Sequence, residues 1–183
     1  MSNMSEKTLE NKKIAMIIAF QNFQDEECFI PRSIFLEKGI AIKIISSENG
    51  EAIGTYGGAI NVDLCLDELN VSDFDAIIFV GGCGAAKYIE NDKCHNIAQK
   101  AVSENKVLGA ICSAPAILAR AGVLKNKKAT AWSSNIDKSI IKILKKQGAN
   151  YQDNPVVIDE KIITANGPSC ARQFAQTIIG LLK

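Results

Sequence analysis

The stretch that most constrains the fold is residues 107–122, which place one cysteine between a strand pattern and a helix pattern. The first five residues are apolar and predict a short buried strand, and the residues after the cysteine carry apolar side chains at helical spacing up to a glycine. The cysteine, Cys112, has Ala110 and Ala114 two residues to either side. Because a sharp turn from strand to helix tolerates only small neighbours, this pattern predicts a nucleophile elbow with sulfur in place of oxygen.

The position of Cys112 permits two interpretations. Unpaired N–H groups and the helix dipole stabilise negative charge at a helix N-terminus, so a thiol there is expected to ionise more readily than a free one. The alternative is a buried structural cysteine, since free cysteine is among the most buried residue types. The flanking alanines and Pro115 favour the reactive interpretation.

Strand and helix patterns alternate along the rest of the chain. Apolar runs of strand length predict strands at 13–20, 40–45, 75–80 and 128–132, and hairpins around 49–58 and at 156–164. Helical patterns follow at 25–39 (with Asp25 as N-cap), 92–104, 135–147 and 171–182. Buried strands that alternate with helices predict a mostly parallel sheet covered on both faces, an α/β three-layer sandwich.

The length of 183 residues suits one domain. We expect residues 13–183 to form it and the polar residues 1–12 to be a flexible tail. In such a sheet, ligands bind beyond the carboxyl ends of the strands. This rule gathers the loops at 81–84, 112–113 and 166–168, together with the loop after the first strand.

Charge and cysteine usage exclude several classes of partner. The net charge of +1 gives no reason to expect nucleic acid, and no apolar run approaches the roughly 20 residues of a membrane span. Six cysteines are scattered singly, and no export signal is evident, so reduced thiols in the cytoplasm are expected. His95 is the only histidine and no cysteine pair has ligand spacing, so we expect no metal and no other cofactor.

Five segments together resemble the ThiJ/PfpI superfamily, which includes the Parkinson-associated protein and many bacterial and archaeal relatives. They are Gln24–Pro31, Phe79–Gly82, Ala110–Pro115, Gly122–Thr130 and Asn166–Pro168. They occur in the family's order and cover nearly the whole chain from Lys13. The resemblance implies a flavodoxin-like α/β sandwich that is commonly a homodimer.

The resemblance also implies roles for particular residues. Cys112 matches the family's elbow cysteine, and Glu27 matches the acidic residue that hydrogen-bonds the thiol. The backbone N–H groups of Gly82 and Ser113 match the pair that forms an oxyanion hole. A carboxyl group held against a thiol in a partly dry pocket is expected to be protonated, and the two N–H groups would stabilise a tetrahedral oxyanion or an oxidised cysteine. Without the resemblance, the sequence predicts that Glu27 is a solvated acidic residue in the first turn of a helix.

The chain departs from the family where relatives carry histidine. Ser113 follows the cysteine where protease-like members have histidine, and Trp132 stands where the Parkinson-associated branch keeps one near the cysteine. His95 aligns with neither position. A Cys–His dyad is therefore not expected, and this disfavours peptidase activity. Trp132 is either a core or interface residue or an apolar wall of the pocket.

Four further residues are expected to line the same pocket. Cys28 and Cys83 are either unpaired, partly buried cysteines or resolving thiols for an oxidised Cys112. Gly167 and Pro168 come from the loop that precedes the last helix.

These features favour a cysteine-centred redox or stress-response protein in which Cys112 is an oxidisable thiolate. The alternatives are a glyoxalase or deglycase that acts on small reactive aldehydes, an amidase or intracellular peptidase, and a non-enzymatic chaperone. The expected partners are a small-molecule substrate or oxidant and a second copy of the chain.

Overall fold

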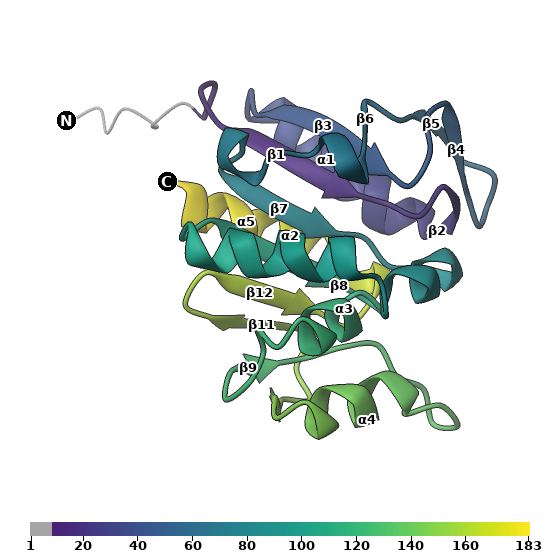
Figure 1. The fold of residues 1–183 in the computed structure, drawn as a ribbon, viewed down its shortest axis with the longest axis vertical. Coiled ribbons are helices and arrows are strands. Elements are labelled where there is room, and N and C mark those ends of the chain that lie inside the picture. The colour runs from purple at the N-terminus through teal and green to yellow at the C-terminus, as the bar shows by residue number, and fades with distance from the viewer. Residues whose placement is uncertain (1–8) are drawn as a thin grey trace.

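The computed structural model of the chain describes residues 9–183, whose centre is a seven-stranded sheet with helices on both faces (Figure 1). The strands lie in the order β11-β12-β8-β7-β1-β3-β6, and every neighbouring pair is parallel except β11 with β12. Their bounds are β1 (Lys13–Ile17), β3 (Ala41–Ser46), β6 (Leu64–Cys65), β7 (Ala76–Phe79), β8 (Val107–Ile111), β11 (Val156–Asp159) and β12 (Ile162–Ala165). The predicted flavodoxin-like sandwich is confirmed.

The helices form the two outer layers, and this explains why the central strands are apolar throughout. Helices α1 (Asp25–Glu37) and α5 (Ala171–Leu182) pack against each other behind the sheet as drawn, and α2 (Asp92–Ser103) crosses in front of it (Figure 1). The short α3 (Pro115–Arg120) contacts both α2 and α4 (Ser139–Lys146). Every residue of β7 and β8 is buried, because helices cover both of their faces.

Two small sheets flank the central one. Strands β4 (Glu51–Gly54) and β5 (Ala59–Asn61) form the predicted antiparallel hairpin, and β2 (Gln21–Phe23) pairs parallel to β4. Strands β9 (Lys128–Ala129) and β10 (Asn150–Tyr151) pair with each other. Short 3-10 helices are η1 (Leu66–Glu68), η2 (Val71–Asp73), η3 (Cys83–Tyr88) and η4 (Pro168–Cys170).

The prediction that Asp25 caps the first helix is wrong. Gln24 holds the N-cap position, and the Asp25 carboxylate instead accepts the backbone N–H groups of Tyr56 at 2.9 Å and Gly58 at 2.7 Å. Asp25 therefore ties the start of α1 to the turn of the β4–β5 hairpin.

The helix predicted from residue 135 begins later, at Ser139. The Asp137 carboxylate accepts the Ser139 N–H at 2.8 Å, and the Ser134 hydroxyl accepts the Asp137 N–H at 3.0 Å. These bonds hold the preceding residues in a turn, because short polar side chains compete with the helix for backbone partners. The strand predicted over 128–132 is likewise short and ends at Ala129.

The N-terminal tail was predicted too long. Leu9 is buried in the hydrophobic core, and the Lys12 ammonium lies 3.0 Å from the Asp75 carboxylate. Residues 1–8 of the predicted tail lie outside the described residues. From Leu9 to Leu182, buried apolar side chains form one contiguous cluster. None of the described helices is long and apolar enough to cross a membrane.

Candidate active site

Cys112 occupies a strained turn between β8 and α3. Its φ of 65° lies in the left-handed region, which a non-glycine residue adopts at an energetic cost that the surrounding structure must offset. Two backbone bonds hold it there: its N–H donates to the Ala165 carbonyl at 2.9 Å, and its own carbonyl accepts the Trp132 N–H at 2.8 Å. Pro115 occupies the first turn of α3, and Ala114 is fully buried. The predicted elbow is present in the structure.

Gly81, at the end of β7, is a residue of the site that the sequence analysis missed. A Cβ atom at this position would lie 2.6 Å from Cys112 Cβ and 2.7 Å from Glu27 Oε2. Both distances are shorter than real Cβ contacts allow. Only glycine therefore lets the thiol and the carboxyl group approach each other across the end of this strand.

Glu27 is fully buried beside Cys112. Its Oε2 accepts the Gly81 N–H at 3.1 Å, and the carboxyl group lies close enough to Cys112 for each group to shift the pKa of the other. The other oxygen, Oε1, is buried and has no hydrogen-bond partner among the described residues. Burial raises the pKa of Glu27 from 4.5 to about 7, and the hydrogen bonds from Cys112 and Gly81 oppose this shift.

The Cys112 thiol does not ionise as readily as the helix N-terminus suggested. Burial raises its pKa to about 12, and the neighbouring Glu27 adds to the rise through its charge and its hydrogen bond. The backbone N–H groups of Gly82 and Ser113 act on the sulfur in the opposite direction. The expectation of a low pKa is therefore wrong, because loss of water outweighs the backbone donors of a helix only six residues long. The pair carries one negative charge above about pH 7, and Cys112 keeps its proton.

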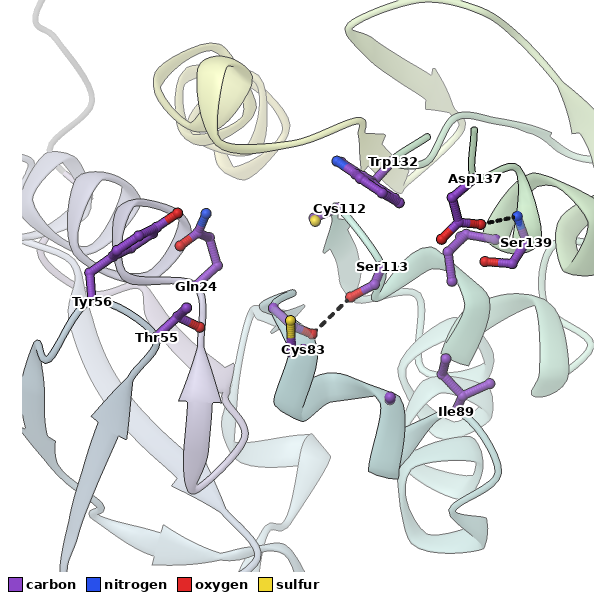
Figure 2. A pocket seen from close by; sticks show the side chains of 13 residues that line it. Gln24, Thr55, Tyr56, Cys83, Ile89, Cys112, Ser113, Trp132, Asp137 and Ser139 are labelled. Carbon is purple, nitrogen blue, oxygen red and sulfur yellow. Dashed lines mark hydrogen bonds between the residues drawn. The ribbon is translucent and has the colours of Figure 1, made fainter. Parts of the chain in front are cut away.

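The Gly82 and Ser113 backbone N–H groups, predicted to form an oxyanion hole, both lower the pKa of the Cys112 thiol, and their oxyanion role stays a prediction. Gly82 has a φ of 109°, and a Cβ there would lie 2.5 Å from the Gln24 backbone nitrogen. The Ser113 hydroxyl donates to the Gly82 carbonyl at 3.2 Å, which links the two loops that supply the donors (Figure 2). An oxygen atom formed on a group bound to Cys112 would meet these N–H groups.

A pocket of about 320 Å³ opens in front of Cys112. Figure 2 shows Gln24, Thr55 and Tyr56 on one side of the thiol, and Trp132 and Asp137 on the other. Asp25 brings one wall of the pocket together, because its hydrogen bonds to the β4–β5 turn hold Tyr56 close to the start of α1, where Gln24 lies. The predicted lining residue Trp132 is half-buried and forms a wall beside Cys112.

The other predicted lining residues lie in different places. Cys83 is exposed and lines the Cys112 pocket. Cys28 does not: it faces the core on α1 with no exposed surface, and burial raises its pKa to about 12. Gly167 and Pro168 line a neighbouring pocket of about 280 Å³, which shares Trp132 with the first. Cys28 was misplaced because it follows Glu27 on α1, where successive side chains point in directions about 100° apart, so only Glu27 lies beside Cys112.

No histidine lines the Cys112 pocket. The His95 Nε2 atom lies 2.7 Å from the Ile89 carbonyl oxygen, and the ring belongs to α2. Within residues 9–183, no group of three or more His, Cys, Asp and Glu side chains could hold a metal ion. Acid–base chemistry beside the thiol therefore depends on Glu27.

The sequence profile of the DJ-1/PfpI family matches residues 12–181. Uncharacterized protein MJ0967 of Methanocaldococcus jannaschii is 38% identical over 97% of this chain and 86% of its own. Deglycase PfpI of Pyrococcus furiosus is 32% identical over 92% of this chain and 98% of its own, and General stress protein 18 of Bacillus subtilis is 30% identical over 94% and 98%. A solved ThiJ/PfpI domain protein from Brachyspira murdochii superimposes with a TM-score of 0.88 at 32% identity, over 93% of this chain and 95% of its own. A profile match over nearly the whole chain, joined to the elbow and its buried glutamate, shows that the protein belongs to the DJ-1/PfpI family.

Proposed function

We propose that the protein converts small 2-oxoaldehydes, such as methylglyoxal, by covalent catalysis at Cys112. The observation that carries this proposal is the contact between the thiol and Glu27, a buried carboxyl group whose pKa is about 7. A general acid–base group is most effective when its pKa lies near the working pH. At neutral pH, Glu27 can both take and return a proton.

The first step is addition of the sulfur to the aldehyde carbon. As the S–C bond forms, the ionised Glu27 takes the thiol proton and the carbonyl π electrons move to oxygen. The N–H groups of Gly82 and Ser113 stabilise the oxyanion, and Glu27 then returns its proton to give a hemithioacetal. Attack coupled to proton transfer does not require a free thiolate, which the high pKa of Cys112 makes scarce.

The second step moves a proton between the two carbons. Glu27 removes the proton of the carbon bound to sulfur and passes it to the neighbouring carbonyl oxygen, which gives an enediol. It then takes the proton of the hydroxyl group on the sulfur-bearing carbon and delivers it to the neighbouring carbon, so the hemithioacetal becomes the thioester of a 2-hydroxy acid. Water then hydrolyses the thioester, which releases the acid and restores the thiol. The substrate is oxidised at one carbon and reduced at the next, so the reaction needs no redox cofactor.

The name of one relative supports this proposal over amide hydrolysis. The Pyrococcus furiosus protein, 32% identical, is named a deglycase. A peptidase must also protonate the leaving amine, and this pocket offers no histidine for that task.

Turnover of methylglyoxal by single-residue variants tests the proposal. We expect lactate from the wild-type protein, none from Cys112→Ala, and at least about a hundredfold lower rate from Glu27→Gln, the usual scale for loss of a general base. Cys65→Ser is the matched control, since Cys65 lies on β6 outside the pocket. Turnover that survives Cys112→Ala would refute the mechanism.

A second candidate function is reversible oxidation of Cys112. The observation that favours it is the presence of two backbone N–H donors and a protonatable carboxyl group around the sulfur, which could hold the oxygens of a sulfinate. The relative named a general stress protein is consistent with such a role. Mild peroxide should then add oxygen to Cys112 before the other cysteines, as read by peptide mass spectrometry. Uniform oxidation of all cysteines would exclude it.

A further inference from the structure

Among the residues that the structure describes, the Cys112 pocket is lined by one negative side chain and by no positive one. Asp137 is the one residue of its lining that carries a formal charge, and the buried Glu27 lies behind the sulfur. No lysine or arginine among residues 9–183 lines the pocket. Lys138 and Lys142 are close in sequence to Asp137, but the Lys138 ammonium is directed to the Ser133 hydroxyl at 3.2 Å. A ligand bound against Cys112 therefore meets carboxylates directly, while the lysines lie outside the lining.

Asp137 is held in its ionised form and in a fixed place. Its carboxylate accepts the Ser139 N–H at 2.8 Å, and this bond, with the positive charge of Lys142, keeps the pKa of Asp137 below its usual range. The turn formed with Ser134 anchors the backbone of the same residue. Figure 2 shows Asp137 across the pocket from Gln24, with Cys112 between them.

The opposite wall adds an unoccupied acceptor. The Gln24 Oε1 atom is buried and has no hydrogen-bond donor among the described residues, although its side chain lines the pocket. A buried acceptor without a partner is costly, and a ligand donor would remove that cost once the Gln24 side chain turns this oxygen toward the pocket. An ammonium group would satisfy both requirements, because it brings a positive charge and N–H donors.

We propose that Asp137 is the specificity-determining residue of this pocket, and that it selects carbonyl substrates bearing a positively charged amine over those bearing a carboxylate or phosphate. The substrate class rests on the proposed carbonyl chemistry at Cys112. The charge selection itself does not, because it acts on any electrophile that reaches the sulfur. Asp137 is exposed to solvent, and Trp132 and Ile140 supply apolar surface in the same pocket.

Reaction of Cys112 with matched thiol reagents tests the selection without requiring turnover. The probes are 2-aminoethyl, 2-sulfonatoethyl and methyl methanethiosulfonate at pH 7, and mass spectrometry of the Cys112 peptide separates its labelling from that of Cys83. Rates for the cationic and anionic reagents are divided by the rate for the neutral one, which removes differences in thiol reactivity. The variants are Asp137→Asn, which keeps an oxygen for the Ser139 N–H, and Asp153→Asn. The latter makes the same charge change in the neighbouring pocket beyond Trp132.

We expect the wild-type protein to favour the cationic over the anionic reagent, and Asp137→Asn to lower that ratio about fivefold, the scale of a unit charge acting at short range in a wet pocket. Asp153→Asn should leave the ratio within about twofold of the wild type. An unchanged ratio in Asp137→Asn, or an equal drop in both variants, would overturn the proposal. If labelling of Cys112 is charge-selective but the protein does not consume methylglyoxal, the role of Asp137 is supported and only the proposed carbonyl chemistry is refuted.

Discussion

Replacing Glu27 with glutamine removes the only fully buried ionisable carboxyl group among residues 9–183 and keeps its size. The pKa of Glu27 is about 7 in the folded protein and 4.5 in the unfolded chain. Between these values the folded state binds a proton that the unfolded state has lost, so the free energy of unfolding falls as pH rises. The contribution of Glu27 is fully present below about pH 4.5, is lost as pH rises toward 7, and is constant above that.

The size of the effect follows from the same two values. A shift of about 2.5 units corresponds to about 3 kcal/mol in total, of which about 2 to 3 kcal/mol falls between pH 5 and pH 8. Glu27→Gln does not titrate, so relative to the wild type it should gain that amount over the same interval. The gain is independent of the constant cost or benefit of introducing an amide.

Urea unfolding of both proteins at pH 5, 6, 7 and 8 measures this difference. The matched control is Glu26→Gln, which makes the same chemical change at an exposed position of the same helix. A difference between wild type and Glu27→Gln that stays flat within about 0.5 kcal/mol from pH 5 to pH 8 would contradict burial as the cause of the raised pKa.

Three other substitutions or treatments follow from the geometry. Gly81→Ala should cost about 2 to 3 kcal/mol of stability and abolish Cys112-dependent turnover, whereas Gly180→Ala, whose Cβ would meet nothing within 4 Å on α5, should raise the melting temperature. Asp25→Ala removes the acceptor of two backbone N–H groups and should cost about 1 to 2 kcal/mol, with faster amide hydrogen exchange confined to residues 55–58. Cys28 should resist iodoacetamide in the native protein and react after unfolding, because burial raises its pKa to about 12; rapid native labelling would contradict its place in the core.

The fold could be predicted from local patterns because each one had a single physical interpretation. An apolar run of strand length followed by a polar amphipathic segment fits only a buried strand and its covering helix. The elbow was also recognisable, since Ala110 and Ala114 flank Cys112 at the spacing that a tight turn requires. The ends of helices and strands were harder to predict. Helix α4 starts at Ser139 because the Asp137 carboxylate accepts the Ser139 N–H, and the spacing of apolar residues does not reveal such a hydrogen bond.

The site was only partly predictable. Glu27 was identified through the family resemblance, since an acidic residue in a first helical turn has no local sign of burial. The prediction of a low pKa for Cys112 was wrong because it considered only the helix dipole and the backbone N–H groups. It did not include the loss of water around the buried sulfur, which raises the pKa. The walls supplied by Gln24, Tyr56 and Asp137 could not be predicted, because they come from separate loops that only the tertiary fold brings together.

Burial raises the pKa of both members of the Glu27–Cys112 pair, and the two shifts have different consequences for what the site can do without histidine. It brings the pKa of the carboxyl group to about 7, where a base and its conjugate acid are both present at neutral pH, and it raises that of the thiol so that sulfur reacts as its proton leaves. Glu27 is then the base that imidazole provides in other elbows. It exchanges protons with the sulfur and with the atoms of a substrate bound to it, whereas no histidine among the described lining residues is available to protonate a departing amine. Additions and proton shifts at a carbonyl need no more than this, whereas amide hydrolysis does, so the geometry of the pair itself favours carbonyl chemistry over proteolysis.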